Sequence, residues 1–383
     1  MPKKTKLVVL YQVIMHYRLP FYEKIAEDDL FDFDLFYGAG IPNTKLKNTS
    51  FSHTNIKSKK FFTIRLPFKT NNSKGAMPFY PFLFFRLIIA NPKVIFSEGS
   101  SSLINASIAF LYAKLFGKKF IWWSLGKLKN RQFKGIRRQV KKWEIFIERR
   151  SDAIFTYSTQ GENYFISNGI PKEKIFIGVN VLDTNKKLKE IKEYQNNTVN
   201  YSFQNYFNIC FIGSITKSKN LDVLINVLSQ FNKKYNNIGR LHVIGDGEYL
   251  EEIKNKTTKI GVAKQVVFHG RINKGASSIL QYCDIMVLPG LGGLAICEAM
   301  LNKLPVITGI ADGTEHDLID DTNGFILENL NEEILLEKVS YLYTNEKIRK
   351  EMGRQSFEKI TGIYHFDNYY QHFCNAVQYS LKN

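Results

Sequence analysis

A chain of 383 residues is longer than one ordinary hydrophobic core, so two domains of roughly 150–200 residues are expected. Its 44% hydrophobic and 14% aromatic content excludes a disordered protein. The formal net charge of +18 calls for an anionic partner (nucleic acid, acidic lipid head groups or a phosphorylated substrate), and charge alone does not choose among these.

Two apolar stretches near the start of the chain resemble membrane-targeting segments. Residues 1–22 are basic and then apolar, but Gln12 interrupts them and no small-residue cleavage site follows, so we predict a buried first strand. Residues 79–93 are the most apolar stretch, yet Arg86 and the flanking prolines leave it short of the ~20 residues that a span needs. No transmembrane helix is predicted.

Buried strands alternate with helical segments along the whole chain. Near-continuous runs of β-branched and aromatic residues are typical of strands covered on both faces. With helices between them, such runs predict parallel α/β sheets, in which ligands bind beyond the carboxyl ends of the strands. The runs are 6–14, 33–40, 93–99, 118–126, 152–158 and 174–180 in the first half, and 207–214, 240–247, 265–271, 284–290 and 304–310 in the second.

The fold class predicted is therefore α/β, with two doubly wound, Rossmann-like domains that face each other across a cleft. They are expected at residues 1–182 and 208–360. The polar, Asn-rich stretch 183–207 reads as a linker, and 361–383 as a final amphipathic helix that packs back toward the first domain. The cleft between the domains is the expected active site.

The sequence predicts a basic amphipathic helix over residues 127–150. It holds ten Lys or Arg residues against Glu144 and Glu148. One hypothesis is peripheral binding to an anionic membrane surface, at the inner face of the cell membrane. The alternative is a helix packed on the core with a solvated basic face. Its apolar residues recur at helical spacing: Phe133, Ile136, Val140, Trp143 and Ile147.

The four cysteines are scattered, with no CxxC pair and no metal-ligand spacing. We interpret Cys210, Cys283, Cys297 and Cys374 as small buried hydrophobic residues, which favours a reducing, cytoplasmic setting. No acidic cluster marks a metal site, and neither a metal nor a cofactor is predicted.

Several loops of the second half have the composition of phosphate-binding turns. The run 211–228 passes from a buried strand through Gly213, Ser214 and a loop that carries Lys219 into a helix. A lysine in a strand-to-helix loop reaches a phosphate held at that edge, or is merely exposed. Residues 240–254 turn through a Gly-Asp-Gly sequence, and 266–272 place a Gly and an Arg just after a strand.

The stretch "PGLGGLAICEAM", residues 289–300, is the most informative turn. Its glycines allow close approach of a ligand to the backbone, and the amides of Leu294 and Ala295 open a helix. Glu298 lies one turn further along the same face, where it would accept hydrogen bonds from a ribose. The alternative is simple stabilisation of the helix dipole by an acid in the first turn.

The order of these motifs resembles the family 4 retaining glycosyltransferases of the GT-B fold, of the bacterial surface-polysaccharide type. The resemblance covers nearly the whole chain and is strongest over 207–330, where "GDGE", "VVFHG", "PVI" and a Glu before "NGF" follow one another. In the first half, "YRLPFYEKIA" and "IWWSLGKLKNR" resemble the matching parts of polysaccharide-assembly members.

This resemblance implies a nucleotide-sugar donor, UDP- or GDP-linked, and a glycan or lipid-linked acceptor. Lys219 would hold the diphosphate, Glu298 the ribose and the backbone of Gly270–Ile272 the base. With no metal, Lys219 and the amides at 294 and 295 would stabilise the leaving group. The remaining donor-side residues implied are Gly213, Ser214, Arg271, Gly290, Gly292, Gly293, Leu294, Ala295 and Glu315.

The acceptor side is expected in the first domain. Glu98, after a strand, is a candidate acceptor contact or base, or a loop-capping carboxylate. Arg18 would meet an acceptor phosphate or lie on the surface. Trp123 and Ser124 complete the predicted acceptor side.

Three positions depart from the family pattern. Gly290 stands where the family usually has Glu, Ser214 where it has Arg, and Leu125 where a His is expected. These departures keep a catalytically silent GT-B module, acting as partner in a glycosylation complex, as an alternative. A nucleic-acid-binding protein is a remote alternative, since no recognition motif accompanies the charge.

Overall fold

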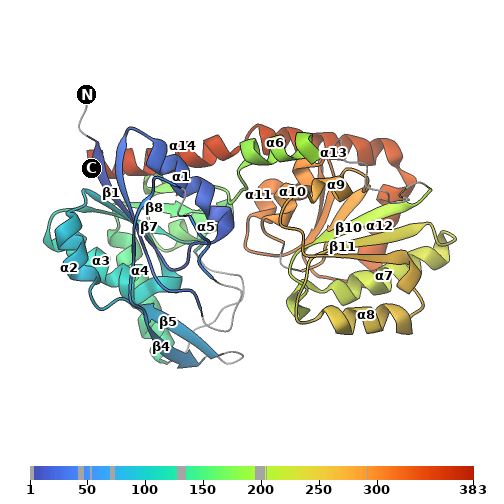
Figure 1. The fold of residues 1–383 in the computed structure, drawn as a ribbon, viewed down its shortest axis with the longest axis horizontal. Coiled ribbons are helices and arrows are strands. Elements are labelled where there is room, and N and C mark those ends of the chain that lie inside the picture. Colours follow the sequence, from blue (N-terminus) through green and yellow to red (C-terminus); the bar gives the residue numbers. More distant parts are fainter. Residues whose placement is uncertain are drawn as a thin grey trace. The chain divides into compact units, whose positions relative to one another are not determined.

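The computed structural model describes residues 4–41, 47–51, 54–69, 74–126, 135–194, 203, 205–290 and 292–383. The chain forms two compact units, Met1–Gly178 with Tyr370–Asn383, and Val179–Tyr369. Helices cover both faces of the main sheet in each unit (Figure 1). The predicted α/β class with two doubly wound domains is confirmed.

The first unit contains a seven-stranded sheet whose described pairings are all parallel, in the order β3-β2-β1-β6-β7-β8-β9. Its centre is built from the apolar runs that the sequence predicts as strands. The strands are β1 (Thr5–Tyr11), β2 (Phe31–Tyr37), β3 (Lys57–Lys60), β6 (Val94–Glu98), β7 (Lys119–Trp123), β8 (Ala153–Thr156) and β9 (Ile175–Ile177).

Alternate side chains of these strands face two helical layers. On one face Phe96 and Trp123 meet Phe21 of α1 and Phe373 of α14. On the other face Trp122 joins a core shared with α2, α3, α4 and α5. The helices are α1 (Leu19–Glu27), α2 (Leu83–Ala90), α3 (Leu103–Leu115), α4 (Ile136–Arg150), α5 (Thr159–Ser167) and α14 (Phe366–Lys382), with single 3-10 turns η1 (His16–Arg18), η2 (Ser100–Ser102) and η3 (Lys172–Lys174).

Three strands of the first unit lack the apolar signature used for prediction. The edge strand β3 has the sequence KSKK and is exposed throughout, and lysines on an edge oppose pairing with another chain. The hairpin β4 (Ile64–Lys69) and β5 (Lys74–Phe79) is antiparallel and forms a separate two-stranded sheet.

The second unit contains a six-stranded parallel sheet in the order β12-β11-β10-β13-β14-β15. Of its strands, only β15 is absent from the predicted set. The strands are β10 (Phe207–Ile212), β11 (Gly239–Ile244), β12 (Val266–Gly270), β13 (Ile285–Leu288), β14 (Val306–Gly309) and β15 (Gly324–Leu327).

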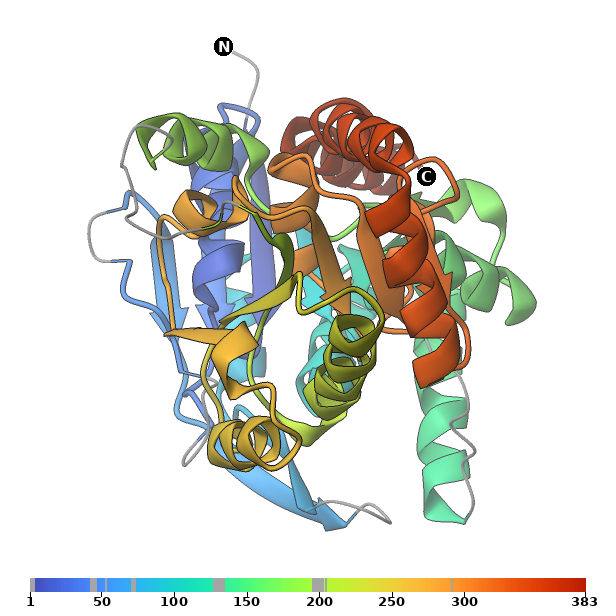
Figure 2. The same ribbon diagram turned by 90° about the vertical axis from the view of Figure 1, so that its right-hand side faces the viewer.

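Helices of the second unit pack in two groups. Helix α7 packs against α8 and α12, while α10 packs against α13 and α6 (Figures 1 and 2). Their bounds are α6 (Thr184–Tyr194), α7 (Leu221–Lys234), α8 (Leu250–Lys259), α9 (Ser277–Leu280), α10 (Ala295–Leu301), α11 (Glu315–Leu318), α12 (Glu332–Thr344) and α13 (Glu346–Thr361), with 3-10 turns η4 (Lys217–Lys219) and η5 (Ala263–Gln265).

The division of the chain differs from the predicted domain limits. Residues 183–207 were expected to be a linker, but Thr184–Tyr194 form helix α6 of the second unit, with Ile191 buried. The final helix α14 begins in the second unit and continues into the first from Tyr370. All four cysteines are free and buried, as predicted.

A buried histidine pair lies within the second sheet. His242 of β11 is 2% exposed and stacks on Phe203. Its Nδ1 lies 3.1 Å from His269 Nε2, and its Nε2 lies 3.1 Å from Asn208 Oδ1. Burial, followed by the charges of His269 and Arg240, lowers the pKa of His242 to about 3.

We expect His242 to make the fold acid-sensitive. Its pKa is depressed in the folded state, so the unfolded chain binds the proton first, and stability is lost as the pH falls below about 6.5. The free energy of unfolding should fall by about 2 kcal/mol between pH 7 and pH 5 from this group. Urea unfolding across that range should show a shallower pH dependence for His242→Gln and an unchanged one for the exposed His16→Gln. Equal slopes for all three proteins would contradict the assignment.

Candidate functional site

Two loops of the second unit leave the sheet side by side. Strands β10 and β13 are neighbours, and the strand order reverses between them. In open parallel sheets, ligands bind beyond the carboxyl ends of the strands at this reversal. The loops that follow β10 and β13 carry Lys219 and the glycine turn 290–293, so the sequence motifs meet at this edge.

Gly290 packs directly on the turn that carries Lys219. A Cβ at Gly290 would lie 2.3 Å from Ser218 O and 2.7 Å from Lys219 Cα. Gly309, at the end of β14, meets the next loop in the same way, since its Cβ would lie 2.3 Å from Pro289 O. Any side chain at position 290 would have to move the backbone of η4, which explains physically why the usual Glu is absent here.

Lys219 lies inside this cluster of loops. Its Cε is 3.9 Å from the point that a Cβ on Gly213 would occupy, so the lysine lies close to the end of β10. Burial lowers the pKa of Lys219, and the charge of Asp312 opposes that shift. Asp312 belongs to the loop after β14 and accepts a hydrogen bond from Thr314 Oγ1 at 2.6 Å. Loops after three neighbouring strands therefore converge around one ammonium group.

The glycine turn leads into the short helix α10. Gly293 has φ +68°, a conformation that favours glycine. Leu294 is the N-cap, Ala295 is the first helical residue, and Ile296 N–H donates to Gly293 O at 3.0 Å. The first N–H groups of a helix have no intrahelical acceptor, so the amides at 294 and 295 are placed as predicted from the sequence.

Glu298 forms an ion pair that the sequence did not predict. Its Oε1 lies 2.8 Å from Lys187 Nζ of α6, and Lys187 also pairs with Glu190 at 3.2 Å. Glu190 in turn accepts a hydrogen bond from Gly275 N–H at 2.6 Å. Burial raises the pKa of Glu298, and Lys187 opposes that rise. Among the described residues, no hydrogen-bond donor meets the buried Glu298 Oε2, which makes this oxygen the candidate acceptor for a ligand hydroxyl.

The other donor-side residues lie around the same edge. Gly270 ends β12, and its carbonyl accepts from Gly245 N–H at 2.8 Å. Arg271 is exposed and donates from Nε to Asn273 Oδ1 at 3.0 Å, and Ile272 is half-buried beside it. Ser214, which follows Gly213, is exposed, and Gly292 is half-buried in the turn.

Glu315 has a different role from the one predicted. It is fully buried, and its two carboxylate oxygens accept hydrogen bonds from Ala311 N–H and Gly313 N–H, both at 2.9 Å. Because both oxygens are used, Glu315 shapes the loop between β14 and α11 and does not present its carboxylate to a ligand.

In the first unit, the predicted acceptor-side residues come together at the corresponding edge. Strands β1 and β6 are neighbours where the strand order reverses. Glu98 at the end of β6 accepts from Gln12 N–H at 2.7 Å and from the Ser101 hydroxyl. Burial raises the pKa of Glu98, while these two donors and the charge of Arg18 lower it. Glu98 therefore caps and links two loops, as the second interpretation of the sequence predicts. The Arg18 charge is close enough to affect its pKa.

The Arg18 guanidinium is held between aromatic rings. It is 6% exposed and lies 5.0 Å from the ring centroid of Trp123 and 4.9 Å from that of Tyr157. Tyr11 also lies here, 4.9 Å from Trp123 between centroids, and burial with the charge of Glu98 raises its pKa. Sequence reasoning missed Tyr11 and Tyr157, although both lie within predicted strand runs, 6–14 and 152–158.

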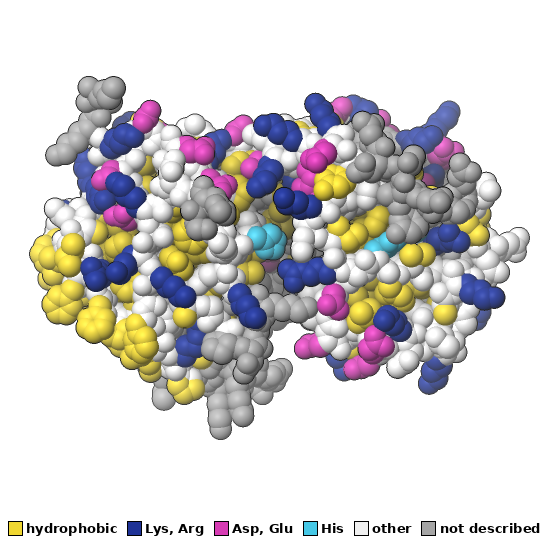
Figure 3. Space-filling view, viewed as in Figure 1, with side chains coloured by type: hydrophobic (Ala, Val, Ile, Leu, Met, Phe, Trp, Pro, Cys, Tyr) yellow, Lys and Arg dark blue, Asp and Glu magenta, His cyan; other side chains and the backbone are white. Residues whose placement is uncertain are grey.

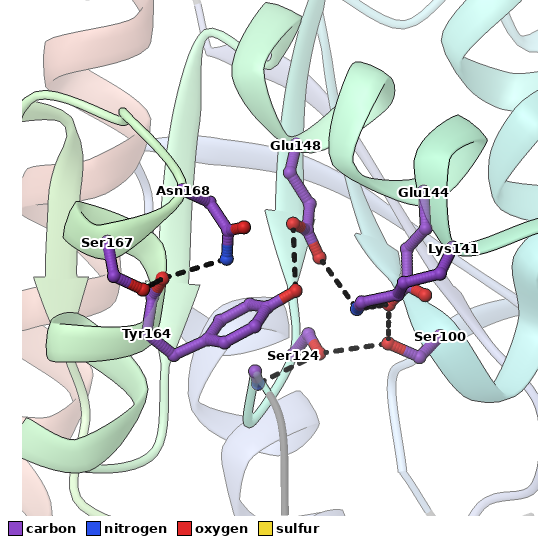
Figure 4. Close-up of polar contacts among 9 residues, drawn as sticks. Ser100, Ser124, Lys141, Glu144, Glu148, Tyr164, Ser167 and Asn168 are labelled. Carbon is purple, nitrogen blue, oxygen red and sulfur yellow. Dashed lines mark hydrogen bonds and ion pairs between the residues drawn. The ribbon is translucent and has the colours of Figure 1, made fainter. Parts of the chain in front are cut away.

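Ser124 joins a second, buried network (Figure 4). Its Oγ lies 3.3 Å from Ser100 Oγ, and the Ser100 hydroxyl donates to Glu144 of α4. Glu144 pairs with Lys141 at 3.0 Å, and Lys141 is 3.9 Å from Glu148.

Tyr164 closes this network from α5. Its hydroxyl donates to Glu148 Oε2 at 3.3 Å. Burial raises the pKa of Glu148 to about 8, against the attraction of Lys141. The two acids of helix α4, Glu144 and Glu148, therefore point into the unit. The apolar row predicted for this helix is only partly buried. Ile147 is buried, whereas Val140 and Trp143 are 41% and 38% exposed. Residues 127–134 of the predicted helix lie outside the described residues.

Comparison with known proteins gives a family match for part of the chain. Residues 193–359 match the profile of the family described as Glycosyl transferases group 1. An uncharacterised glycosyltransferase of Methanocaldococcus jannaschii is 27% identical over 219 residues, 54% of this chain and 60% of that protein. The poly(ribitol-phosphate) alpha-N-acetylglucosaminyltransferase of Staphylococcus aureus is 26% identical over 172 residues, 43% of this chain and 34% of that protein. The matched stretches thus span less than two thirds of the length of either relative.

The whole fold is similar to that of solved GT-B proteins. The Anabaena protein HepE, in complex with UDP, superposes with a TM-score of 0.75 at 15% identity, over 98% of this chain and 100% of that one. The fold of the chain is therefore GT-B, with two Rossmann-like domains. Across the described ranges, no helix is both long and apolar enough to span a bilayer. Nor do three or more His, Cys, Asp or Glu side chains group as metal ligands there; metal independence stays a prediction.

We expect Gly290→Ala to destabilise the second unit. The added Cβ meets backbone atoms that cannot rotate away, so the free energy of unfolding should fall by about 1–3 kcal/mol in urea titrations. Gly292→Ala is the matched control, because its Cβ would meet only side-chain atoms of Ile296 and Thr308, at 3.2 and 3.3 Å. Equal stability of the two variants would show that the backbone of η4 moves without cost, which contradicts the prediction.

Lys187→Met should reveal the buried charge on Glu298. Without the Lys187 ammonium, burial holds the pKa of Glu298 in the folded protein above its pKa in the unfolded chain. Stability is therefore lost as the pH rises above the unfolded-state pKa. We expect a deficit of up to about 3 kcal/mol at high pH, shrinking toward acid. The exposed neighbour Lys186→Met should show none.

A double-variant cycle tests the coupling directly. Lys187→Met combined with Glu298→Gln should recover most of the lost stability, because no charge then remains buried without a partner. Simple additivity of the two effects would contradict a direct ion pair.

Proposed function

We propose that the chain is a glycosyltransferase that moves a sugar from a nucleotide-sugar donor to a glycan or lipid-linked acceptor in the synthesis of bacterial cell-surface polysaccharide. The donor is UDP- or GDP-linked, the reaction retains configuration and needs no metal, and the protein works in the cytoplasm at the inner face of the cell membrane. The observation that carries the proposal is the half-buried Glu298, with one oxygen on Lys187 and the other without a described hydrogen-bond partner.

Three features support a donor site at the carboxyl edge of the second sheet. The family match covers Lys219, the turn 290–293 and Glu298 within residues 193–359. Glu298 lies one helical turn after the amides at 294 and 295, a spacing that suits a ribose beside a phosphate. HepE, whose fold is similar, has been solved with UDP and with UDP-glucose.

In the proposed mechanism the protein stabilises the departing nucleotide diphosphate. The backbone of Lys219 is held by its close contact with Gly290, and the amides of Leu294 and Ala295 are held at the start of α10, so we expect little reorganisation as negative charge builds up. The acceptor is held by the first unit, where Arg18 contributes a positive charge beside Glu98 and Trp123. Since both Glu98 oxygens already accept hydrogen bonds from Gln12 and Ser101, we assign Glu98 to holding these two loops and not to proton abstraction.

A catalytically silent GT-B module is the second candidate, and Gly290 and Ser214 favour it. The position of the usual Glu is filled by the η4 backbone, and the usual Arg is an exposed serine. A silent module would bind nucleotide but neither transfer nor hydrolyse the sugar. A thermal-shift screen against UDP-, GDP-, ADP- and CMP-linked sugars, followed by product analysis, separates the two candidates.

Two variants test the donor site once a nucleotide is found. Glu298→Ala should weaken nucleotide binding by about 10- to 100-fold, the effect of losing a charged hydrogen-bond acceptor. Lys219→Ala should lower kcat by about 100-fold with a smaller effect on KM, because its charge acts mainly on the leaving group. Calorimetry and initial rates measure both.

Lys217→Ala is the matched control, because Lys217 lies in the same 3-10 turn and is exposed. Wild-type binding and rates in both Glu298→Ala and Lys219→Ala would refute the donor site.

A further inference from the structure

One outer surface of the first unit exposes large apolar side chains that no described residue covers. Helices α2 and α3 pack together through Phe84, which meets Tyr112 at 5.9 Å and Phe116 at 6.3 Å between centroids. Their outward sides are apolar, and Figure 3 shows hydrophobic side chains gathered over these two helices. The exposed residues are Phe82 (62%), Phe85 (64%), Ile88, Ile89 (72%), Leu111, Leu115 (71%) and Phe116.

Helix α4 extends this apolar surface. Trp143 stacks on Phe146 at 5.1 Å, and its indole N–H donates to Ser107 Oγ of α3 at 2.8 Å. Leu111 lies one helical turn after Ser107, so the row on α4 is next to the exposed row on α3. We call the whole surface the α2–α4 face; it consists of the seven residues above together with Val140, Trp143 and Phe146.

Basic residues surround this face, and acidic side chains are withdrawn from it. Residues 82–151 contain fifteen Lys or Arg residues and three Glu, a net charge of +12 out of +18 for the chain. Glu144 and Glu148 are buried, and Glu98 accepts hydrogen bonds at the sheet edge. Exposed bases lie among the apolar side chains: Arg86 on α2, and Arg138, Lys142, Arg149 and Arg150 on α4. Lys114 on α3 pairs with Asp152 at 3.3 Å.

We propose that the α2–α4 face docks the protein on an anionic lipid bilayer, with its apolar side chains at the level of the head groups and its Lys and Arg residues on the lipid phosphates. Exposed Trp, Phe, Ile and Leu among basic residues are the composition of an interfacial membrane-binding surface. A nucleic acid offers nothing to the exposed aliphatic side chains. A second copy would bring two strongly positive faces together.

This inference rests on the proposed function, since it names where a lipid-linked acceptor is presented. The three helices form one layer on the same face of the sheet, so their exposed sides all point away from it. Docking through this layer leaves the carboxyl edge of the sheet, with Arg18 and Glu98, beside the bilayer surface and not beneath it.

The test is vesicle flotation with the full chain. We expect binding to vesicles of phosphatidylglycerol and phosphatidylcholine at about 1:2, and little binding to phosphatidylcholine alone. A triple variant, Phe85→Ser, Ile89→Ser and Leu115→Ser, should bind about tenfold more weakly. Arg86→Glu and Lys142→Glu should each lose about fivefold, on anionic vesicles only. Ile363→Ser, an equally exposed apolar residue of the second unit, is the matched control.

Trp143 gives a second readout that does not depend on flotation. Of the three tryptophans, Trp122 and Trp123 are buried and Trp143 is 38% exposed. Anionic vesicles should shift the Trp143 emission to the blue and protect it from iodide. Unchanged emission, or a triple variant that floats like the wild type, would overturn the proposal.

Oligomeric state and nucleotide binding complete the design. A concentration-dependent increase in mass in solution that the triple variant abolishes would make this face a self-association surface and overturn the proposal. Vesicle binding is measured without nucleotide, so a protein that floats but binds no nucleotide-sugar refutes the proposed function alone. A protein that binds nucleotide-sugar but does not float refutes the docking alone.

Discussion

The close backbone contact between Gly290 and the turn at Ser218 and Lys219 is the constraint on which the second unit's carboxyl edge depends. With 2.3 Å between a would-be Cβ and Ser218 O, the two loops occupy the space that a side chain would need. The contact fixes Lys219 near the end of β10 and brings the loops after β13 and β14 up to it. A side chain at position 290 could be accommodated only if the backbone at Ser218 and Lys219 moved.

Electrostatics then governs what this edge can bind. A carboxylate as buried as Glu298 needs a partner to stay ionised, and Lys187 supplies it at 2.8 Å. Lys187 lies before residue 193, where the family match begins, on helix α6 of the second unit. The matched region therefore does not contain every group that sets the charge of its own site. One oxygen of Glu298 is held by the chain itself, which orients the other and reduces the entropy that a bound hydroxyl would otherwise have to remove.

The sequence predicts the strands of both main sheets well because buried parallel strands form continuous apolar runs. It fails where that signature is missing: β3 is four exposed polar residues that pair only with β2. The linker prediction for helix α6 is wrong because most of its residues are polar, with four Lys and two Glu, although Thr184, Lys187 and Ile191 share one face at helical spacing. The sequence locates the loops that follow the strands, but it does not predict which atoms a side chain in such a loop contacts. Both Glu315 oxygens accept hydrogen bonds from its own loop. These contacts depend on the backbone geometry and cannot be inferred from the spacing of residues in the sequence.

The distribution of acids in the first unit connects its stability to its surface. On α4, Glu144 and Glu148 turn inward onto Lys141, Ser100 and Tyr164, and burial raises the pKa of Glu148 to about 8. Two inward acids remove the charges that would otherwise neutralise the basic outer side of the helix. The sequence 82–151 carries a net charge of +12, and an anionic partner relieves the repulsion among its Lys and Arg residues. Counter-ions in solution reduce the charge repulsion. They do not cover the exposed phenylalanine, isoleucine and leucine side chains on the same layer. A lipid surface is the partner class that satisfies the charge and the apolar area at once.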